Sequence, residues 1–280
     1  MKIAVPNKGS LAESSISILK EAGYRQRSDS RDLILVDPEN DVEFYYLRPR
    51  DIALYVGNGE LTAGITGRDL LIDSGANAEE VLALNFGGST FRFAGSDQKN
   101  YSEADLSGKR IATAYPGLVN NYLARRQINA DVVRLDGAVE TSVRLGVADL
   151  IADVVSTGNT LRQAGLKIFG EPILRSEAIL ICRKGSIVSP SFEILKRRLG
   201  GVVIARQYVL VDYDIETNKL EVACALTPGF ESPTISNLAK SGWSAVRSMV
   251  KRSDINKIMD ELYTLGARGI LVTDIHACRL

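Results

Sequence analysis

The chain has 280 residues, enough for two or three small α/β units that each bury a core. Its 34 Lys and Arg residues balance 34 Asp and Glu residues, and no apolar run approaches a signal peptide or a membrane span, which argues against partners such as nucleic acid or a membrane. One histidine and three widely spaced cysteines disfavour His-based catalysis and a disulfide framework, so the composition predicts a cytoplasmic protein.

The first predicted unit is a strand, a polar turn and a helix. Residues 2–6 form the strand, Lys8 and Gly9 lie in the turn, and a helix over residues 11–22 follows Ser10 as its N-cap. Unpaired N–H groups and the helix dipole make such a helix start suitable for an anion, and Lys8 adds a positive charge. The alternative is that Lys8 is a solvated turn residue.

Two more predicted strands end at charged residues. A hairpin over residues 33–47 leads to Arg48 and Arg50 at the start of a helix, and a later strand leads through a glycine turn to Arg68 and Asp69. The carboxyl ends of strands form the ligand-binding edge of an open α/β sheet, so Arg48 and Asp69 are predicted to converge there with the lysine of the first turn. A charged helix start and a local surface ion pair are the alternatives.

A second lobe is predicted after a polar segment over residues 95–106. Strands over residues 80–84 and 90–94 precede this segment, and residues 110–114 form the first strand beyond it. That strand turns at Tyr115 into a helix, which makes Tyr115 a candidate to pack on a base or a sugar. The alternative is an aromatic side chain that simply ends a strand.

The stretch from residue 140 to residue 161 carries the strongest signal. A short helix over residues 140–145 ends at a glycine, a flat apolar strand over residues 150–155 follows, and the chain turns through residues 156–160 into another helix. Hydroxyls, a glycine and a helix N-terminus together predict a phosphate cradle, with Asp153 beside it for a sugar diol or a metal. An N-cap turn without a ligand is the alternative.

The C-terminal part is predicted to return to the first lobe and then to form a separate module. Residues 171–182 are rich in strand, and an amphipathic helix over residues 190–199 ends at Gly200. Residues 206–280 then follow the order strand, helix, strand, strand, helix, strand, which is the ferredoxin-like arrangement. Such a module suits a regulatory or oligomerising role better than a catalytic one.

Ten positions of the central stretch and four shorter segments follow the pattern of one family. They are Glu140, Gly146, Ala148, Ile151, Asp153, Val154, Thr157, Gly158, Thr160 and Leu161, with the segments 4–9, 48–49, 64–69 and 110–116. This pattern resembles that of the ATP phosphoribosyltransferases, the first enzymes of histidine biosynthesis. The C-terminal module makes the chain similar to the long form, because the short form lacks that module.

The resemblance implies an α/β fold with a bilobal, periplasmic-binding-protein-like catalytic core and a C-terminal ferredoxin-like regulatory domain. It implies a first catalytic lobe in residues 1–94 and 171–189, and a second lobe, which binds phosphoribosyl diphosphate, in residues 95–170. A linker helix over residues 190–205 leads to the regulatory domain over residues 206–280.

By the same resemblance, the chain joins ATP to 5-phosphoribosyl 1-diphosphate: N1 of adenine attacks the anomeric carbon, and diphosphate leaves with Mg²⁺. Such a dissociative transition state needs positioning and charge stabilisation more than a strong base. The implied catalytic residues are Lys8, Arg48, Glu140 and Asp153, of which Glu140 and Asp153 also reach a metal held mainly by substrate phosphates. The implied substrate-binding residues are Gly9, Arg68, Asp69, Tyr115, Val154, Ser156, Thr157, Gly158, Asn159, Thr160 and Leu161.

The family's long form is inhibited by histidine and assembles as homo-oligomers, from dimers to hexamers. The resemblance implies a histidine pocket in the C-terminal module, made by Asp214, Phe230, Ser232, Thr234 and Thr273. Asp214 would pair with the cationic group of the ligand, and Ser232 and Thr234 would hydrogen-bond it. A proline-rich surface turn is the alternative for the loop before Thr234.

A non-enzymatic bilobal sensor with an amino-acid-binding module is the competing hypothesis. A passive sensor has no need of a phosphate cradle, and no helix-turn-helix motif or basic patch indicates a regulator that binds DNA. The sequence therefore favours an enzyme that acts on small molecules, with no nucleic acid and no membrane among its partners.

Overall fold

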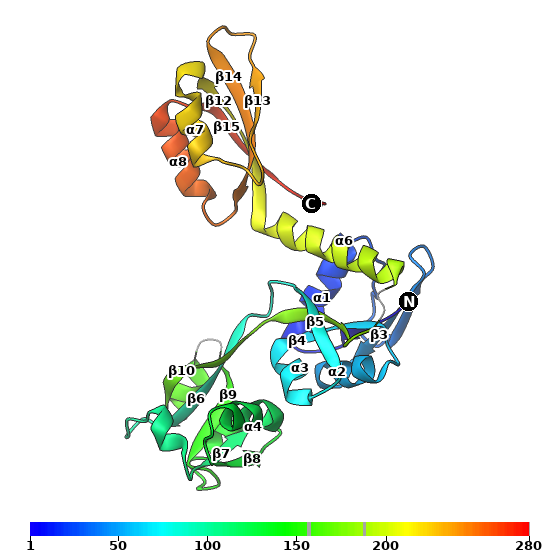
Figure 1. Cartoon of the computed structure of the whole chain (residues 1–280), viewed down its shortest axis with the longest axis vertical. Coiled ribbons are helices and arrows are strands. Elements are labelled where there is room, and N and C mark those ends of the chain that lie inside the picture. The colour runs from blue at the N-terminus through cyan, green and yellow to red at the C-terminus, as the bar shows by residue number, and fades with distance from the viewer. Residues whose placement is uncertain (156–157, 187–188, 280) are drawn as a thin grey trace. The chain divides into compact units, whose positions relative to one another are not determined.

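The computed structural model describes residues 1–155, 158–186 and 189–279. The chain forms two compact units, of which unit 1 comprises residues 1–20 and 24–196, and unit 2 comprises residues 21–23 and 197–280. Unit 1 contains two open sheets, each with its own helices, and unit 2 contains a third sheet (Figure 1).

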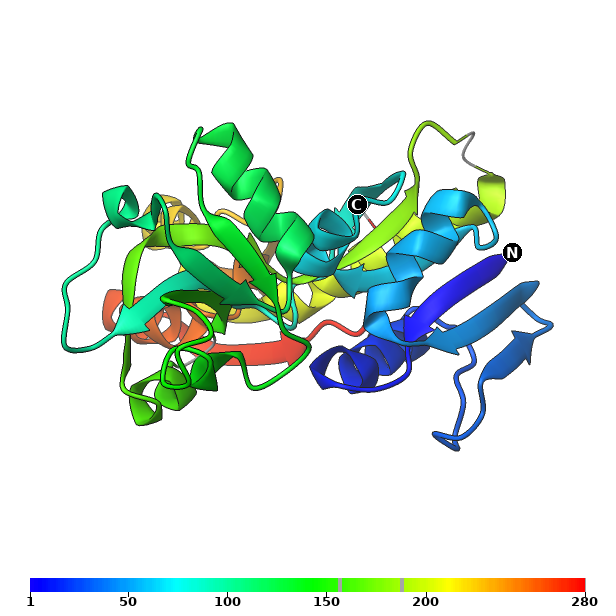
Figure 2. The ribbon, with the colours of Figure 1, turned by 90° about the horizontal axis from the view of Figure 1, so that it is seen from below.

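Lobe I of unit 1 is built on a six-stranded sheet in the order β2-β3-β1-β4-β11-β5. β1 pairs in parallel with β3 and β4, whereas β11 runs antiparallel between β4 and β5. Figure 2 shows α1 and α2 on opposite sides of this sheet, which buries β1 on both faces. The elements are β1 (Lys2–Pro6), α1 (Ser10–Glu21), β2 (Ile34–Asp37), β3 (Val42–Leu47), α2 (Pro49–Asn58), β4 (Ala63–Gly67), α3 (Arg68–Ser74), β5 (Ala78–Ala83) and β11 (Ala178–Arg183).

Lobe II of unit 1 is built on a five-stranded sheet in the order β10-β6-β9-β7-β8. α4 covers one face, where Val119 packs with Phe91 and Phe93, and Ile151 and Leu161 belong to the core on the other face. The elements are β6 (Ser89–Ser96), the 3₁₀ helix η1 (Glu103–Leu106), β7 (Arg110–Thr113), α4 (Pro116–Arg125), β8 (Asp131–Arg134), the 3₁₀ helix η2 (Val139–Thr141), β9 (Leu150–Val155), α5 (Asn159–Gln163) and β10 (Leu166–Ser176).

The chain crosses between the lobes at residues 84–88 and at Glu177, not over the polar segment 95–106 as predicted. β6 already pairs with β9 and β10 in the second sheet, because its alternating Phe91 and Phe93 fit the core under α4. β10 likewise pairs with β6 as far as Ser176. The polar segment instead comprises the last two residues of β6, the loop that follows and η1.

The helix predicted over residues 140–145 is only the 3₁₀ turn η2 followed by hydrogen-bonded turns. Thr141 Oγ1 donates to the Ala138 carbonyl at 2.8 Å, and Ser142 Oγ donates to the Val139 carbonyl at 2.7 Å. Local side-chain hydrogen bonds of this kind compete with the backbone hydrogen bonds of an α-helix. A stretch this short gains too little stability from packing to offset that competition.

The helix predicted to end at Gly200 continues as α6 (Pro190–Gln207). Its apolar positions Leu195, Leu199 and Val202 are buried at helical spacing, so packing continues across the glycines. A side-chain carbon at Gly201 would lie 2.0 Å from the Cys278 carbonyl oxygen. The glycine therefore permits close approach of the C-terminal segment and does not end the helix.

Unit 2 has a four-stranded antiparallel sheet in the order β13-β14-β12-β15, with α7 and α8 on one face (Figure 1). Val209, Val211, Tyr213 and Ile215 of β12 form the core with these helices. This order is the ferredoxin-like arrangement, so the predicted fold class is confirmed. The elements are β12 (Tyr208–Glu216), the 3₁₀ helix η3 (Thr217–Lys219), α7 (Leu220–Leu226), β13 (Thr234–Asn237), β14 (Trp243–Lys251), α8 (Ile255–Leu265) and β15 (Arg268–Asp274).

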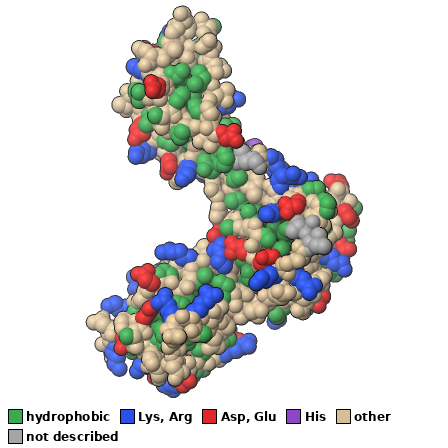
Figure 3. Space-filling model, in the orientation of Figure 1, with side chains coloured by type: hydrophobic (Ala, Val, Ile, Leu, Met, Phe, Trp, Pro, Cys, Tyr) green, Lys and Arg blue, Asp and Glu red, His purple; other side chains and the backbone are tan. Residues whose placement is uncertain are grey.

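Charged side chains are interspersed by sign over the surface. Figure 3 shows Lys and Arg beside Asp and Glu on the face in view, without a broad area of one sign. Within the residues that the structure describes, no helix combines the length and the apolar character needed to span a membrane.

Candidate functional site

A cleft of 950 Å³ is lined by residues of both lobes of unit 1. Most of its lining comes from the turns after β1, β3, β4, β7 and β8 and from the two crossings. The lining residues are Lys8, Gly9, Ser10, Leu11, Arg48, Pro49, Arg50, Asp51, Gly67, Asp69, Leu70, Gly87, Gly88, Ser89, Tyr115, Arg134, Asp136, Val154, Ser176 and Glu177. The cleft therefore lies at the strand ends, where open α/β sheets bind ligands.

Lys8 and Arg48, predicted to meet at this edge, both line the cleft. Lys8 follows β1, and Gly9 beside it has a φ of 81° that favours glycine. Arg48 is the N-cap of α2 in extended conformation, followed by Pro49 at the first helical position, and its side chain makes no capping hydrogen bond. The helix start thus fixes the backbone of Arg48 while its guanidinium is not used as a cap.

Asp69 is the buried acid of the cleft wall. Its Oδ1 accepts a hydrogen bond from Ser176 Oγ at 2.9 Å and from the Leu70 N–H at 3.0 Å, and its own N–H donates to Ser176 Oγ at 3.0 Å. Ser176 ends β10, so the bond joins the start of α3 to the second crossing. These hydrogen bonds hold the Asp69 carboxylate in place in the cleft wall.

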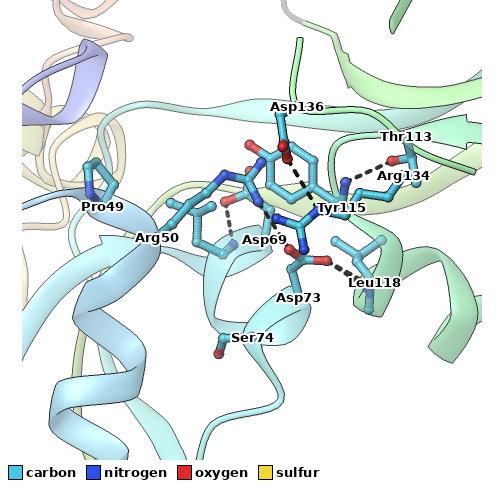
Figure 4. Close-up of polar contacts among 12 residues, drawn as sticks. Pro49, Arg50, Asp69, Asp73, Ser74, Thr113, Tyr115, Leu118, Arg134 and Asp136 are labelled. Atoms are coloured by element: carbon cyan, nitrogen blue, oxygen red, sulfur yellow. Dashed lines mark hydrogen bonds and ion pairs between the residues drawn. The ribbon is translucent and has the colours of Figure 1, made fainter.

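Tyr115 and Arg50 form a stacked pair across the lobes. The Arg50 guanidinium lies 4.4 Å from the centre of the Tyr115 ring (Figure 4). Phe91 packs edge-on against the ring, with 5.2 Å between the ring centres. Burial, and then the charge of Asp69, raise the pKa of Tyr115 above its ordinary range, so the phenol stays protonated at neutral pH. A planar cation on an aromatic face is a suitable platform for a purine.

Arg134, Asp136, Ser176 and Glu177 are among the lining residues that were not singled out from the sequence. Arg134 ends β8, which runs parallel to β7, and forms an ion pair with Asp136 at 3.2 Å. Tyr115 was singled out because it follows the carboxyl end of a strand, and the same reasoning would also have indicated Arg134. Ser176 and Glu177 lie at the second crossing, whose position the sequence pattern misplaced.

The charges of the cleft balance. Among the described lining residues, the basic side chains are Lys8, Arg48, Arg50 and Arg134, and the acidic ones are Asp51, Asp69, Asp136 and Glu177.

Arg68, which was predicted to bind substrate, is not among the residues that line the cleft. Its guanidinium pairs with Glu80 at 2.7 Å and with Glu177 at 3.2 Å, and donates to the Arg175 carbonyl at 3.2 Å. The hydrogen bonds to Glu80 raise the pKa of Arg68. Glu177 also accepts a hydrogen bond from the Asn85 N–H at 3.0 Å. Arg68, Glu80 and Glu177 therefore form one cluster, the Arg68 cluster, which joins the two crossings between the lobes.

Arg68→Ala is expected to lower the free energy of unfolding of unit 1 by about 1–3 kcal/mol, because it removes charged hydrogen bonds to two partly buried acids. Urea unfolding followed by circular dichroism measures the loss. Arg110→Ala is the matched control, since its pair with Asp149 is more exposed and an exposed pair contributes about 0–1 kcal/mol. Equal losses in the two variants would contradict a special role for the Arg68 cluster.

β9 presents its two faces to different surroundings. Val154 lines the cleft, whereas Asp153 shares a face with Ile151, toward the core that includes Val139 and Leu161. Asp153 Oδ1 accepts a hydrogen bond from the Val154 N–H at 2.7 Å. Burial, and next the charge of Glu140, raise the pKa of Asp153.

The predicted phosphate cradle is described only in part. Ser156 and Thr157 lie outside the described residues. Gly158 has a φ of 72° as the N-cap of α5, and α5 has only five residues, so its dipole is weaker than that of a longer helix. Among the described residues, Glu140, Asp153 and the segment Gly158–Leu161 do not line the cleft itself.

Glu140 and Asp153 are the acids considered for a metal. The described residues contain no group of three or more His, Cys, Asp or Glu side chains suited to a metal. The pair nevertheless fits Mg²⁺, which commonly takes one or two carboxylates and completes its shell with phosphate oxygens and water. Burial raises the pKa of Asp153 and the charge of Glu140 adds to the rise, and a cation held by both acids would offset this charge.

Comparison with known proteins settles the family. The sequence profile described as HisG, ATP phosphoribosyltransferase, matches residues 48–200, and the profile described as HisG, C-terminal domain, matches residues 205–277. The chain is 62% identical over 283 residues to the ATP phosphoribosyltransferase of Pseudarthrobacter chlorophenolicus and 58% identical over 280 residues to that of Salinispora tropica, with 100% of each chain covered. The chain belongs to the ATP phosphoribosyltransferase family.

Among solved structures, the ATP phosphoribosyl transferase (HisG:HisZ) complex from Thermotoga maritima matches 71% of this chain and 96% of that chain, with a TM-score of 0.60 at 24% identity. At that identity the likeness shows a shared fold. Membership in the ATP phosphoribosyltransferase family makes the chain a transferase of the first step of histidine biosynthesis, in the long form that carries the C-terminal domain. The sensor hypothesis is not favoured.

Of the residues predicted for histidine in this long-form ATP phosphoribosyltransferase, the three strand residues Asp214, Thr234 and Thr273 share one face of the unit 2 sheet. Asp214 alternates with the core residues of β12 and therefore points away from α7 and α8. Thr273 pairs in register with Leu210, and Thr234 with Arg247, both on that same face. Phe230 packs edge-on against Tyr208 at 5.9 Å, while Ser232 Oγ donates to the Pro233 carbonyl at 3.4 Å.

Proposed function

We propose that the cleft of unit 1 binds ATP and 5-phosphoribosyl 1-diphosphate and transfers the phosphoribosyl group to N1 of adenine. The observation that supports this proposal is the meeting of Lys8, Arg48 and Arg50 with the Tyr115 ring in one cleft. Phosphate groups need fixed cations, and a purine needs a flat platform, so the cleft suits both parts of the two substrates.

In the proposed mechanism the ribose gains positive charge while the departing diphosphate gains negative charge. Lys8 and Arg48 would hold the diphosphate, so that fixed cations stabilise the charge that develops on its leaving oxygen. Arg50 and Tyr115 would orient the adenine so that N1 faces the anomeric carbon. N1 attacks with a lone pair as the bond to diphosphate breaks, which requires no base before the new bond forms.

The turn over residues 156–160 would hold the 5-phosphate through backbone N–H groups and the Thr160 hydroxyl, with Glu140 and Asp153 on the ribose hydroxyls. This part of the proposal rests on the family motif and on the position of β9, whose Val154 lines the cleft. Glu140 and Asp153 would also hold Mg²⁺ together with substrate phosphate oxygens. Bound there, the ion would supply positive charge to the leaving diphosphate.

The near-ultraviolet absorbance of the protein with ATP, 5-phosphoribosyl 1-diphosphate and Mg²⁺ tests the proposal directly. Adenine alkylated at N1 absorbs differently from ATP, so formation of the product is seen as a rise. A rise that depends on both substrates supports the proposal, and no rise with fresh substrates and metal would overturn it.

Histidine is proposed to inhibit the enzyme by binding the sheet face of unit 2 that carries Asp214, Thr234 and Thr273. Asp214→Ala and Thr234→Ala are expected to raise the histidine concentration for half inhibition at least about tenfold, because each removes a charged or neutral hydrogen bond to the ligand. The absorbance assay with increasing histidine measures this shift. Asp260→Ala on α8 is the control and should leave inhibition unchanged. Unaltered inhibition in both Asp214→Ala and Thr234→Ala would exclude this face.

The chain is further proposed to form homo-oligomers, from dimers to hexamers, as the long form implies. Sedimentation velocity over a range of protein concentrations tests this proposal, and a monomer at all concentrations would contradict it.

A further inference from the structure

A carboxylate of lobe I closes the start of a helix in lobe II. Asp73, in α3, has a side chain only 13% exposed, and its Oδ1 accepts a hydrogen bond from the N–H of Gly117 at 2.9 Å. The same oxygen accepts a second hydrogen bond, from the N–H of Leu118 at 3.2 Å (Figure 4). These residues are the second and third of α4. An Asp oxygen on the free N–H groups of a helix start is the usual capping arrangement, but here the cap comes from 44 residues away, in the other lobe.

α4 has no cap of its own. Its N-cap residue, Tyr115, makes no capping hydrogen bond, and Pro116 at the first position has no N–H to satisfy. The Val119 N–H already bonds to the Tyr115 carbonyl within the helix. Gly117 and Leu118 therefore carry the two N–H groups of this helix start that need a partner, and Asp73 satisfies both.

The two helices also approach too closely for any residue but glycine at position 117. A side-chain carbon on Gly117 would lie 2.2 Å from the backbone carbonyl oxygen of Asp73. Any larger residue would have to push α3 and α4 apart. Both the carboxylate of Asp73 and the absence of a side chain at Gly117 are therefore needed only when the lobes lie in this arrangement.

Asp73 also reaches the cleft wall. Its Oδ2 lies 3.3 Å from Arg50 Nη1, and Arg50 stacks on the Tyr115 ring, which stands at the start of α4. One carboxylate therefore orients the cation of lobe I and the helix that carries the aromatic ring of lobe II.

We propose that Asp73 is the positioning residue that holds lobe II at the angle at which Arg50 and Tyr115 face one substrate. This inference rests on the proposed function of the cleft. Without the cap, a smaller fraction of molecules has the competent arrangement, so the apparent affinity for substrates falls by that fraction while saturated enzyme keeps most of its turnover. The expected signature is a raised KM with a smaller change in kcat.

Three variants and a control test the proposal. Asp73→Ala removes the cap, Asp73→Asn keeps an acceptor oxygen, and Gly117→Ala forces the helices apart while leaving the carboxylate in place. Alanine is a better helix former than glycine, so a loss in Gly117→Ala does not come from helix propensity. Asp105→Ala is the control, because Asp105 caps η1 within lobe II through Ser102.

We expect kcat/KM to fall about tenfold or more in Asp73→Ala and Gly117→Ala, mainly through KM, since the apparent affinity falls by the fraction of molecules in the competent arrangement. Asp73→Asn should recover most of the loss, and Asp105→Ala should match the wild type. Wild-type KM in both Asp73→Ala and Gly117→Ala, or an equal loss in Asp105→Ala, would overturn the proposal.

Hydrogen exchange of the peptide over residues 116–122 separates this inference from the function on which it rests. The N–H groups of Gly117 and Leu118 should exchange faster in Asp73→Ala than in the wild type and Asp73→Asn, whatever the cleft binds. Unchanged exchange in Asp73→Ala would overturn the cap even if the enzyme is active. Failure of the substrate assay with faster exchange would instead overturn the proposed function of the cleft.

Discussion

Arg48→Ala is expected to lower kcat/KM by about 100-fold to 1000-fold, since it removes a fixed cation from the leaving diphosphate at the moment its charge develops. Its side chain caps no helix, and Pro49 still starts α2, so the folded state should be preserved. Arg48→Lys keeps the charge but loses the planar fork, and an intermediate loss is expected. Steady-state kinetics with each substrate varied in turn measures both variants.

Arg31→Ala is the matched control for this prediction. Arg31 has a side chain that is 88% exposed and forms an ion pair with Asp29, two residues before it, so its loss should leave kcat/KM unchanged. If Arg48→Ala retained wild-type kcat/KM for both substrates, the cleft would bind its phosphates elsewhere.

Asp153→Asn is expected to give an enzyme that is nearly inactive and more heat-stable than the wild type. The loss of activity should be about 100-fold, because the variant removes a charge proposed to hold the ribose and the metal. The gain in stability follows from burial and from Glu140, which make the ionised Asp153 unfavourable in the folded state. An Asn in its place keeps an oxygen to accept from the Val154 N–H.

The difference in thermal stability between Asp153→Asn and the wild type should depend on pH in a definite direction. A carboxyl whose pKa is raised on folding binds its proton more readily in the folded state, so stability falls as pH rises from about 4 through the raised pKa. Thermal unfolding should therefore show a gap between Asp153→Asn and wild type that widens toward neutral pH and closes in acid.

Asp149→Asn provides the opposite case in the same lobe. Hydrogen bonds from Arg110 lower the pKa of Asp149 to about 2, so its ionised form stabilises the folded state above its unfolded pKa. Asp149→Asn should thus melt below the wild type at neutral pH, and that difference should fade as pH falls. If Asp153→Asn also melted below the wild type, the carboxylate would contribute to the fold rather than oppose it.

Elements with complete local signals could be predicted from the sequence. The two helices predicted in the C-terminal module are present as α7 and α8, and the apolar stripe of α8 is bounded by Asp254 and by Gly266, which has a φ of 110°. The convergence of Lys8 and Arg48 was also predictable, since both follow strands whose ends share one edge of a sheet.

Contacts between distant segments could not be predicted in this way. Arg68 and Asp69 are adjacent in the sequence and look like one motif. In the structure, however, the Arg68 side chain bonds to acids beside the crossings between the lobes, whereas Asp69 lies in the cleft wall. Their difference is set by Glu177 and Ser176, more than one hundred residues away. The role of Asp73 depends in the same way on the absence of a local cap at α4, which only the folded structure reveals.

The balance of charge in the cleft has a consequence for how substrates arrive. Both substrates are polyanions, yet four acidic side chains offset the four basic ones that line the cleft, so little net field extends into solvent to accelerate their diffusion. Association should therefore depend only weakly on ionic strength. Once a polyanion has entered, it is bound by short-range contacts with individual guanidinium and ammonium groups. Products of similar charge then dissociate without strong long-range attraction back to the cleft.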